Sequence, residues 1–172
     1  MSVTSTHRGT HPVEALQVSR LALVIVRAGV LPAGAAEAVA EAGNRVLLVG
    51  SGTHEAALEL GAARTWHAET VGAAPARLAA ALAPLLQDVR MLVLPASPDG
   101  RDFAPRLAAA LDRPLLAWAT EAGVDDDGTT ATLARLDGRL DVKVRCEQPC
   151  VVTLVPGARN PLPPSNGEVF EV

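Results

Sequence analysis

Short runs of apolar residues alternate with longer alanine- and leucine-rich segments of helical periodicity along most of the chain. The first run, Leu21 to Val26, contains no polar residue, which is typical of a parallel strand buried on both faces. The sequence predicts five such strands, at residues 21–26, 45–49, 64–67, 91–94 and 115–119, and helices at 32–41, 53–60, 75–86 and in a segment ending near 111. This alternation with short connections predicts an α/β domain in which helices flank a mostly parallel sheet.

The pattern changes in the last third of the chain. The segments 129–136 and 140–145 predict two strands joined across Asp137-Gly138, which is a strong hairpin signal. A further strand is predicted at 151–155. We therefore expect the parallel part of the sheet to be followed by an antiparallel hairpin and strand extension near the C-terminus.

The length of 172 residues fits a single domain, and an apolar content of 49% is enough to build a core. We expect a flexible N-terminal tail over residues 1–20 and one domain over 21–158. Residues 159–172 are rich in proline, so we expect a tail or linker there.

Composition excludes several classes of function. Aromatic residues make up 2% of the chain and the net charge is −4, both of which disfavour nucleic-acid binding. The first apolar run, Leu21 to Val26, ends at Arg27 and is too short for a signal peptide or a membrane span. We therefore expect a cytoplasmic protein without membrane insertion, in which Cys146 and Cys150 are free thiols.

The run Gly50-Ser51-Gly52 follows the second predicted strand and opens a helix, which invites a dinucleotide-binding interpretation. That fingerprint follows the first strand and needs a third small residue, whereas Glu55 stands at the corresponding position here. A tight turn with Thr53 as the N-cap of the next helix is the favoured interpretation.

The loop after the fourth predicted strand is the main candidate site. If the strand order is 3-2-1-4-5, ligands would collect between the loops that follow strands one and four. In the second loop, Gly100 permits close approach of the backbone and Arg101 offers a forked anion-binding group. The candidate residues are Ser97, Asp99, Gly100, Arg101 and Asp102. The alternative is a well-capped helix with a surface arginine, in which Asp102 is the N-cap and Pro105 lies in the first turn.

No catalytic or metal-binding arrangement stands out. The histidines, at 7, 11, 54 and 67, are distant in sequence from Cys146 and Cys150, so we predict no metal site. We also find no pairing of a nucleophile with a base and no paired carboxylates. An enzyme with chemistry of its own is therefore disfavoured.

The segment Ala96 to Leu111 reads Ala-Ser-Pro-Asp-Gly-Arg-Asp-Phe-Ala-Pro-Arg-Leu-Ala-Ala-Ala-Leu and is followed by Arg113-Pro-Leu-Leu. It resembles a segment of electron transfer flavoprotein alpha subunits that reads small-x-x-x-Gly-basic-Asp-apolar-Ala-Pro-Arg-Leu-Ala. The hairpin at Gly138 and the run 151–158, which ends in Pro-Gly-Ala, are similar to the same family in order and spacing. The resemblance covers residues 21–158 and concerns the N-terminal domain of that subunit.

This resemblance implies a Rossmann-like three-layer sandwich of the adenine-nucleotide-hydrolase-like kind. It also implies an electron transfer flavoprotein beta-type subunit as partner and dehydrogenases as electron donors. In the family, FAD is held mainly by a second alpha-subunit domain, and the sequence up to Val172 contains none of that domain's motifs. We therefore expect FAD only in a complex, through a partner or a separate FAD domain, and no flavin site in this chain alone.

Two departures from the family pattern point to a divergent branch. The family's Arg-Pro-aromatic run before the hairpin glycine is replaced by residues 133–136, where Arg135 lies two positions out of register. The family's Pro-Gly-Ala-Phe ending is Pro-Gly-Ala-Arg here, with Arg159 in place of the aromatic residue. A faint likeness suggests a branch associated with the peptide-derived cofactor mycofactocin.

The sequence thus favours a scaffold or docking domain in flavin-mediated electron transfer from dehydrogenases, rather than an enzyme. The alternative is a stand-alone adenine-nucleotide-binding domain that uses the loops 27–31 and 97–102.

Overall fold

The computed structural model describes residues 16–172, so most of the predicted N-terminal tail lies outside the described residues. The strands are β1 (Arg20–Val26), β2 (Arg45–Gly50), β3 (Arg64–Glu69), β4 (Met91–Pro95), β5 (Leu115–Asp125), β6 (Gly128–Arg135), β7 (Leu140–Cys146), β8 (Cys150–Leu154) and β9 (Glu168–Glu171). The helices are α1 (Ala35–Glu41), α2 (Thr53–Leu60), α3 (Pro75–Leu86) and α4 (Pro98–Leu111). Among residues 16–172, no helix combines the length and hydrophobicity needed to span a membrane.

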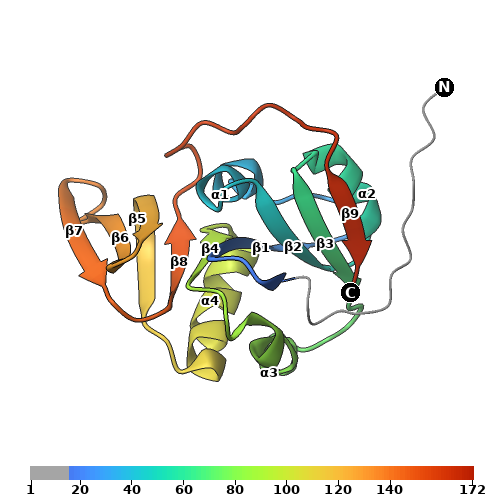
Figure 1. Cartoon of the computed structure of the whole chain (residues 1–172), viewed down its shortest axis with the longest axis horizontal. Helices are drawn as coiled ribbons and strands as arrows, with labels where there is room; N and C mark the ends of the chain where they lie inside the picture. The colour runs from blue at the N-terminus through green and yellow to red at the C-terminus, as the bar shows by residue number, and fades with distance from the viewer. Residues whose placement is uncertain (1–15) are drawn as a thin grey trace.

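The strands form one sheet in the order β7-β6-β5-β8-β4-β1-β2-β3-β9 (Figure 1). Pairing is parallel from β5 through β8, β4, β1, β2 and β3 to β9, and antiparallel between β5, β6 and β7. The expected α/β architecture with an antiparallel extension is therefore confirmed. The expected order 3-2-1-4-5 is wrong at one place, because β8 is inserted between β4 and β5. Every residue of β8 is buried, which requires a neighbouring strand along each edge as well as packing over both faces.

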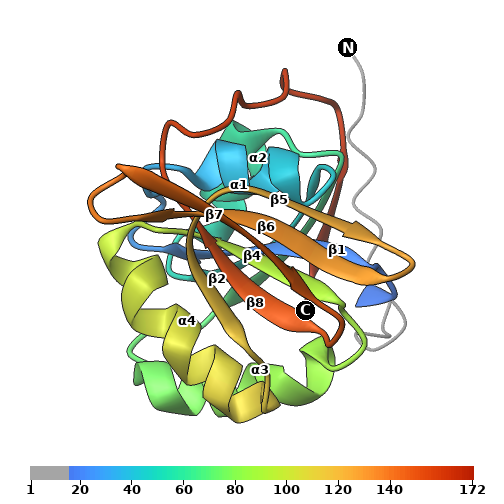
Figure 2. The same ribbon diagram turned by 90° about the vertical axis from the view of Figure 1, so that its left-hand side faces the viewer.

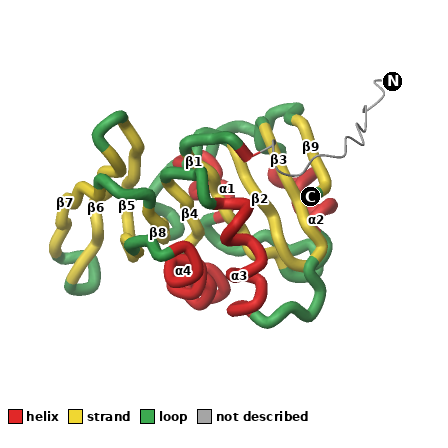
Figure 3. Tube along the Cα trace, turned by 60° about the horizontal axis from the view of Figure 1, so that its bottom comes forward, coloured by secondary structure: helices red, strands yellow, loops and turns green. Residues whose placement is uncertain are grey.

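Helices cover both faces of the sheet, as Figures 1 and 3 show. Alternate residues of β1 point to opposite faces: Ala22 and Val24 enter the core under α1 and α2, while Leu21 and Leu23 enter the core under α3 and α4. Each fully buried leucine of this kind stabilises the fold by about 1.5–3 kcal/mol. This three-layer packing fixes the ends of the parallel strands, where a site can form.

The strand β5 reverses direction at Trp118. Its first half runs parallel to β8, with Ala119 opposite Leu154, and the register shifts between Ala119 and Glu121. The backbone carbonyl of its last residue, Asp125, accepts a hydrogen bond from the Arg90 guanidinium at 3.2 Å. Arg90 directly precedes β4. The second half of β5 therefore returns toward the start of β4. Figure 2, viewed from the β7 edge, shows β5 passing close to α1.

The C-terminal segment, predicted as a tail or linker, ends in a strand of the sheet. It crosses near α2, where the Ser165 amide donates to the Gly61 carbonyl at 2.7 Å, and β9 then pairs with β3. Phe170 of β9 stacks on Trp66 of β3 with ring centroids 6.0 Å apart. The short β9 lacks the length to stand out from a proline-rich segment, so its pairing could not be predicted from local sequence.

Glu41 connects three distant parts of the chain. Its side chain is 5% exposed, and one carboxylate oxygen accepts a hydrogen bond from the Ala122 amide in the returning half of β5. The other oxygen accepts from Arg159 Nε at 2.9 Å. Arg159, the residue that departs from the family's Pro-Gly-Ala-Phe pattern, therefore ties the start of the C-terminal segment to α1.

We expect Glu41→Ala to lower the free energy of unfolding by about 1–3 kcal/mol, because it leaves the Ala122 amide and the Arg159 guanidinium without their acceptor. Urea titration followed by tryptophan fluorescence measures the change. Glu59, an exposed carboxylate on α2, supplies the matched control, and Glu59→Ala should stay within about 0.5 kcal/mol of wild type. Equal stability of the two variants would contradict the role given to Glu41.

Candidate functional site

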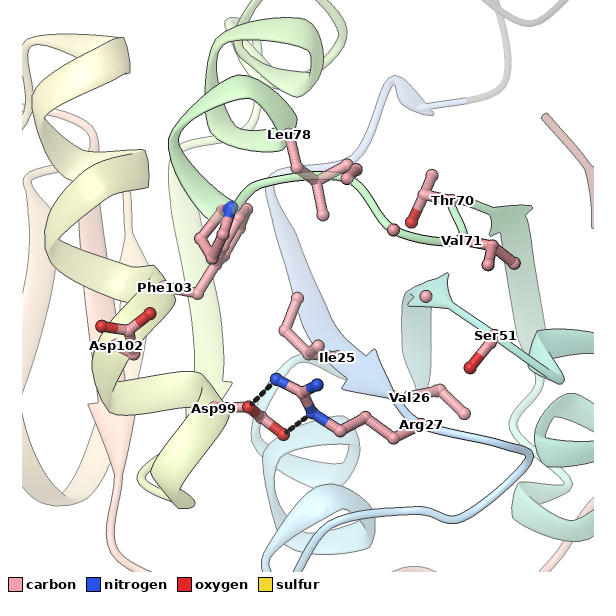
Figure 4. Close-up of a pocket in the computed structure, with 14 residues that line it drawn as sticks. Ile25, Val26, Arg27, Ser51, Thr70, Val71, Leu78, Asp99, Asp102 and Phe103 are labelled. Carbon is pink, nitrogen blue, oxygen red and sulfur yellow. Dashed lines mark hydrogen bonds and ion pairs between the residues drawn. The ribbon is translucent and has the colours of Figure 1, made fainter.

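A small pocket lies at the carboxyl ends of the central strands, where β1 and β4 are neighbours. The chain leaves β1 toward α1 on one face and leaves β4 toward α4 on the other, which is the switch point of a doubly wound sheet. The pocket has a volume of about 180 Å³. It is lined by residues that follow β1 and β2, by the loop after β3 and by the first turns of α4 (Figure 4).

An ion pair joins the loops after β1 and β4, which the sequence predicts to flank the site. The guanidinium of Arg27, directly after β1, donates two hydrogen bonds to the Asp99 carboxylate, at 2.7 and 2.5 Å. These hydrogen bonds lower the pKa of Asp99 and raise the pKa of Arg27. The Arg27 side chain is 73% exposed, so the pair lies at the mouth of the pocket, and Figure 4 shows it among the lining residues. Arg27 therefore already has a carboxylate where an anionic ligand would bind.

Three of the other candidate residues, Ser97, Gly100 and Asp102, stabilise or belong to the start of helix α4. Ser97 is its N-cap and accepts a hydrogen bond from the Gly100 amide at 3.2 Å. A Cβ on Gly100 would lie 1.9 Å from the Pro95 carbonyl oxygen, so only glycine fits there. Asp102 pairs with Arg106 at 2.6 Å, one helical turn away. Of the five candidates, only Asp99 and Asp102 line the pocket.

The expected N-cap of α4 is therefore wrong. The helix begins one turn earlier than Asp102, since Ser97 caps it and Pro98 takes the first helical position. Pro105 consequently lies inside the helix rather than in its first turn. The ring removes one backbone donor there, and tertiary packing of Phe103 and Leu107 in the core outweighs that loss.

The remaining candidate, Arg101, points away from the pocket toward a second depression. Its guanidinium carbon lies 5.8 Å from the centre of the Trp118 ring, at the reversal of β5. Beside this ring is a groove of about 600 Å³, which we call the Trp118 groove and which is lined by Ala117, Trp118, Ala134, Arg135, Leu136, Asp137, Gly138 and Val155. Sequence reasoning missed this groove. The available signal was an isolated tryptophan at the end of a predicted strand.

The loop Gly50-Ser51-Gly52 has no open anion site. The carboxylate of Glu69, at the end of β3, accepts hydrogen bonds from the Gly52 and Thr53 amides at 3.1 and 2.6 Å. It also accepts from the Thr53 hydroxyl at 2.6 Å, and these hydrogen bonds lower the pKa of Glu69. A side-chain carboxylate thus occupies the helix N-terminus that would hold a phosphate.

The glycines of this loop have a packing role. A Cβ on Gly52 would lie 2.3 Å from the Gly29 nitrogen, so the loops after β1 and β2 are in direct backbone contact. Gly52, with φ of 68°, is the N-cap of α2, which corrects the expectation that Thr53 caps it. Glu69 was missed, although Gly50 and Glu69 are register partners on neighbouring strands.

No metal centre forms among the described residues. No group of three or more histidine, cysteine or acidic side chains in residues 16–172 could hold a metal ion. Cys146 and Cys150 are free thiols, and burial raises the pKa of Cys150. His67 is buried beside Thr53, with 3.3 Å between its Nδ1 and the hydroxyl oxygen.

Comparison with known proteins identifies the family. The electron transfer flavoprotein domain model matches residues 33–172, from the start of α1 through β9. The chain belongs to the electron transfer flavoprotein family. A comparison with curated protein sequences finds no match. Proteins of this family carry electrons, and the mostly parallel sheet with flanking helices is the architecture expected of such a domain.

We expect Gly100→Ala to lower the free energy of unfolding by about 1–3 kcal/mol, because the added methyl group collides with the Pro95 carbonyl. The control is Gly123→Ala, whose methyl group would meet only the Thr130 hydroxyl, at 3.8 Å. That variant should unfold within about 0.5 kcal/mol of wild type. A Gly100→Ala protein as stable as the control would show that the α4 start is not held against Pro95.

The buried His67 should make stability depend on pH. Burial, with a contribution from His54, lowers the pKa of His67, so the unfolded chain binds the proton more readily than the folded one. The free energy of unfolding is then retained above about pH 6.5, the pKa of histidine in the unfolded chain, and decreases as pH falls below that value. His67→Gln should flatten this dependence, whereas His54→Gln should preserve most of it. Urea titrations across this range measure the slope, and an unchanged slope in His67→Gln would refute the assignment.

Proposed function

We propose that this domain is the alpha-type scaffold of an electron transfer flavoprotein, which docks a beta-type subunit and positions a flavin held elsewhere in the complex. The observation that carries this proposal is that the anion-binding groups of the carboxyl edge are bonded to the chain's own carboxylates. Arg27 binds Asp99, and the start of α2 binds Glu69. The family match and the alpha-type segment 96–111 support the same proposal.

FAD, which the family implies, does not fit the switch-point pocket. Small-molecule sites usually enclose about 300–1,000 Å³, whereas this pocket holds about 180 Å³. A pyrophosphate also needs unoccupied backbone amides at a helix start. At α2 those amides donate to Glu69, and at α4 the Gly100 amide donates to Ser97. The residues of this chain therefore serve to hold a rigid surface, and the flavin would come from a partner or a separate FAD domain.

The direct test is complex formation. We expect the purified domain to be colourless and to co-elute with a beta-type electron transfer flavoprotein subunit in size-exclusion chromatography. Absorbance at flavin wavelengths should follow the partner or the complex rather than this chain. A preparation of the domain alone that carries stoichiometric flavin would contradict the assignment, as would a failure to bind any beta-type subunit.

A second candidate function is adenine-nucleotide binding, and the position of Arg27 at the pocket mouth favours it. A phosphate would have to displace Asp99 from Arg27, which costs the two hydrogen bonds between them. In titration calorimetry with AMP, ATP and FAD we expect no binding to wild type. Micromolar binding that Arg27→Ala abolishes would favour this second function. Arg101→Ala is the weaker probe, since Arg101 stacks on Trp118 and does not line the pocket.

A further inference from the structure

The Trp118 groove concentrates backbone strain at the surface. Six residues other than glycine have a positive φ in the described chain, and three of them, Trp118, Leu136 and Asp137, line this groove. The values are 61°, 50° and 56°, in the left-handed region that disfavours large side chains. Such strain persists where surrounding structure enforces it and is concentrated at binding and catalytic sites. Leu136 and Asp137 form the turn of the β6–β7 hairpin, which requires positive φ, so the strained residue that lines the groove is Trp118.

Apolar side chains are exposed at the groove and in the hairpin beside it. Trp118 is 44% exposed and Leu136 is 66% exposed, and Leu140, 47% exposed, follows in the same hairpin. The backbone amide of Trp118 donates to the Thr153 hydroxyl at 3.0 Å, which fixes the residue at the reversal of β5. A preformed apolar groove with an exposed tryptophan is typical of the energetic centre of a protein interface.

The rim of the groove has a net positive charge, because three arginines stand against the single carboxylate of Asp137. Arg101 stacks on the Trp118 ring, and the guanidinium of Arg135 donates to the Ala117 carbonyl at 3.0 Å. Arg139 donates to the Leu136 carbonyl at 3.1 Å. Within residues 16–172, none of these three arginines forms an ion pair with a carboxylate, although the chain has a net charge of −4. The charge complement of this rim is an acidic surface.

We propose that the Trp118 groove is the docking site for the beta-type subunit. The segment of the partner that enters it carries an apolar side chain flanked by Asp or Glu. This inference rests on the proposed function. A second copy of this chain is the poorer occupant, since a symmetric dimer through the groove would place the arginine rims of the two copies against each other. The apolar side chain packs on Trp118 and Leu136, and the carboxylates meet Arg101 and Arg139.

The test measures the affinity of a purified beta-type subunit for variants of this domain by titration calorimetry. Trp118→Gly removes the ring and relieves the positive φ, so this variant should fold as well as wild type. We expect it to weaken binding at least tenfold. Arg101→Glu should weaken binding to a similar degree, and higher salt should reduce the wild-type affinity while affecting Arg101→Glu less.

The matched controls are Leu58→Ser on α2 and Leu162→Ser in the C-terminal segment, both exposed apolar residues away from the groove. They should bind within twofold of wild type. If wild type binds and the groove variants bind equally well, the docking site lies elsewhere and the proposed function stands. Self-association of wild type that Trp118→Gly abolishes would make a second copy the occupant and overturn the inference. If wild type binds no beta-type subunit, the proposed function itself fails.

Discussion

The reversal of β5 at Trp118 is the constraint on which the C-terminal half of the structure depends. Without it, the second half of β5 would continue past the end of β8, and the hairpin β6–β7 would extend away from the core. The reversal instead brings Ala122 beside α1, where Glu41 accepts its amide hydrogen. The same carboxylate binds Arg159, so α1, the returning half of β5 and the C-terminal segment meet at one buried group. Beyond Arg159 the C-terminal segment passes α2, where the Ser165 amide donates to the Gly61 carbonyl, and β9 then pairs with β3.

The carboxyl edge of the sheet is divided into two parts with different electrostatics. At the switch point, Arg27 and the start of α2 are neutralised by Asp99 and Glu69. Farther along the edge, Arg101, Arg135 and Arg139 bind a ring or backbone carbonyls and keep their net charge available. Folds of this class often bind nucleotides at the first part, and here its arginine and its helix-start amides already have carboxylate acceptors. The second part remains able to attract an acidic partner, which accords with a docking role.

The elements that depend on local patterns were predictable. The apolar run of β1 and the Asp137-Gly138 hairpin gave correct strands, because burial on two faces and turn chemistry are local properties of the sequence. The place of β8 was not predictable in the same way. Its apolar residues show that it is buried, but its two neighbours, β4 on one side and β5 on the other, are chosen by tertiary packing. The start of α4 was misplaced because both Ser97 and Asp102 are good N-caps, and a proline inside a helix is unfavourable in isolation.

The candidate site shows the same division between local and nonlocal information. Chain order placed the loops after β1 and β4 together, so the neighbourhood of Arg27 and Asp99 could be predicted from topology. Which partner each side chain takes depends on distances of a few ångströms between separate elements, and neither the Glu69 contacts nor the stacking of Arg101 on Trp118 has a sequence signature. The positive φ of Trp118, 61°, is likewise nonlocal information, since sequence alone gives no reason for it. The hairpin and β8 hold this residue in place, so the strain at the groove is a property of the assembled fold rather than of its local segments.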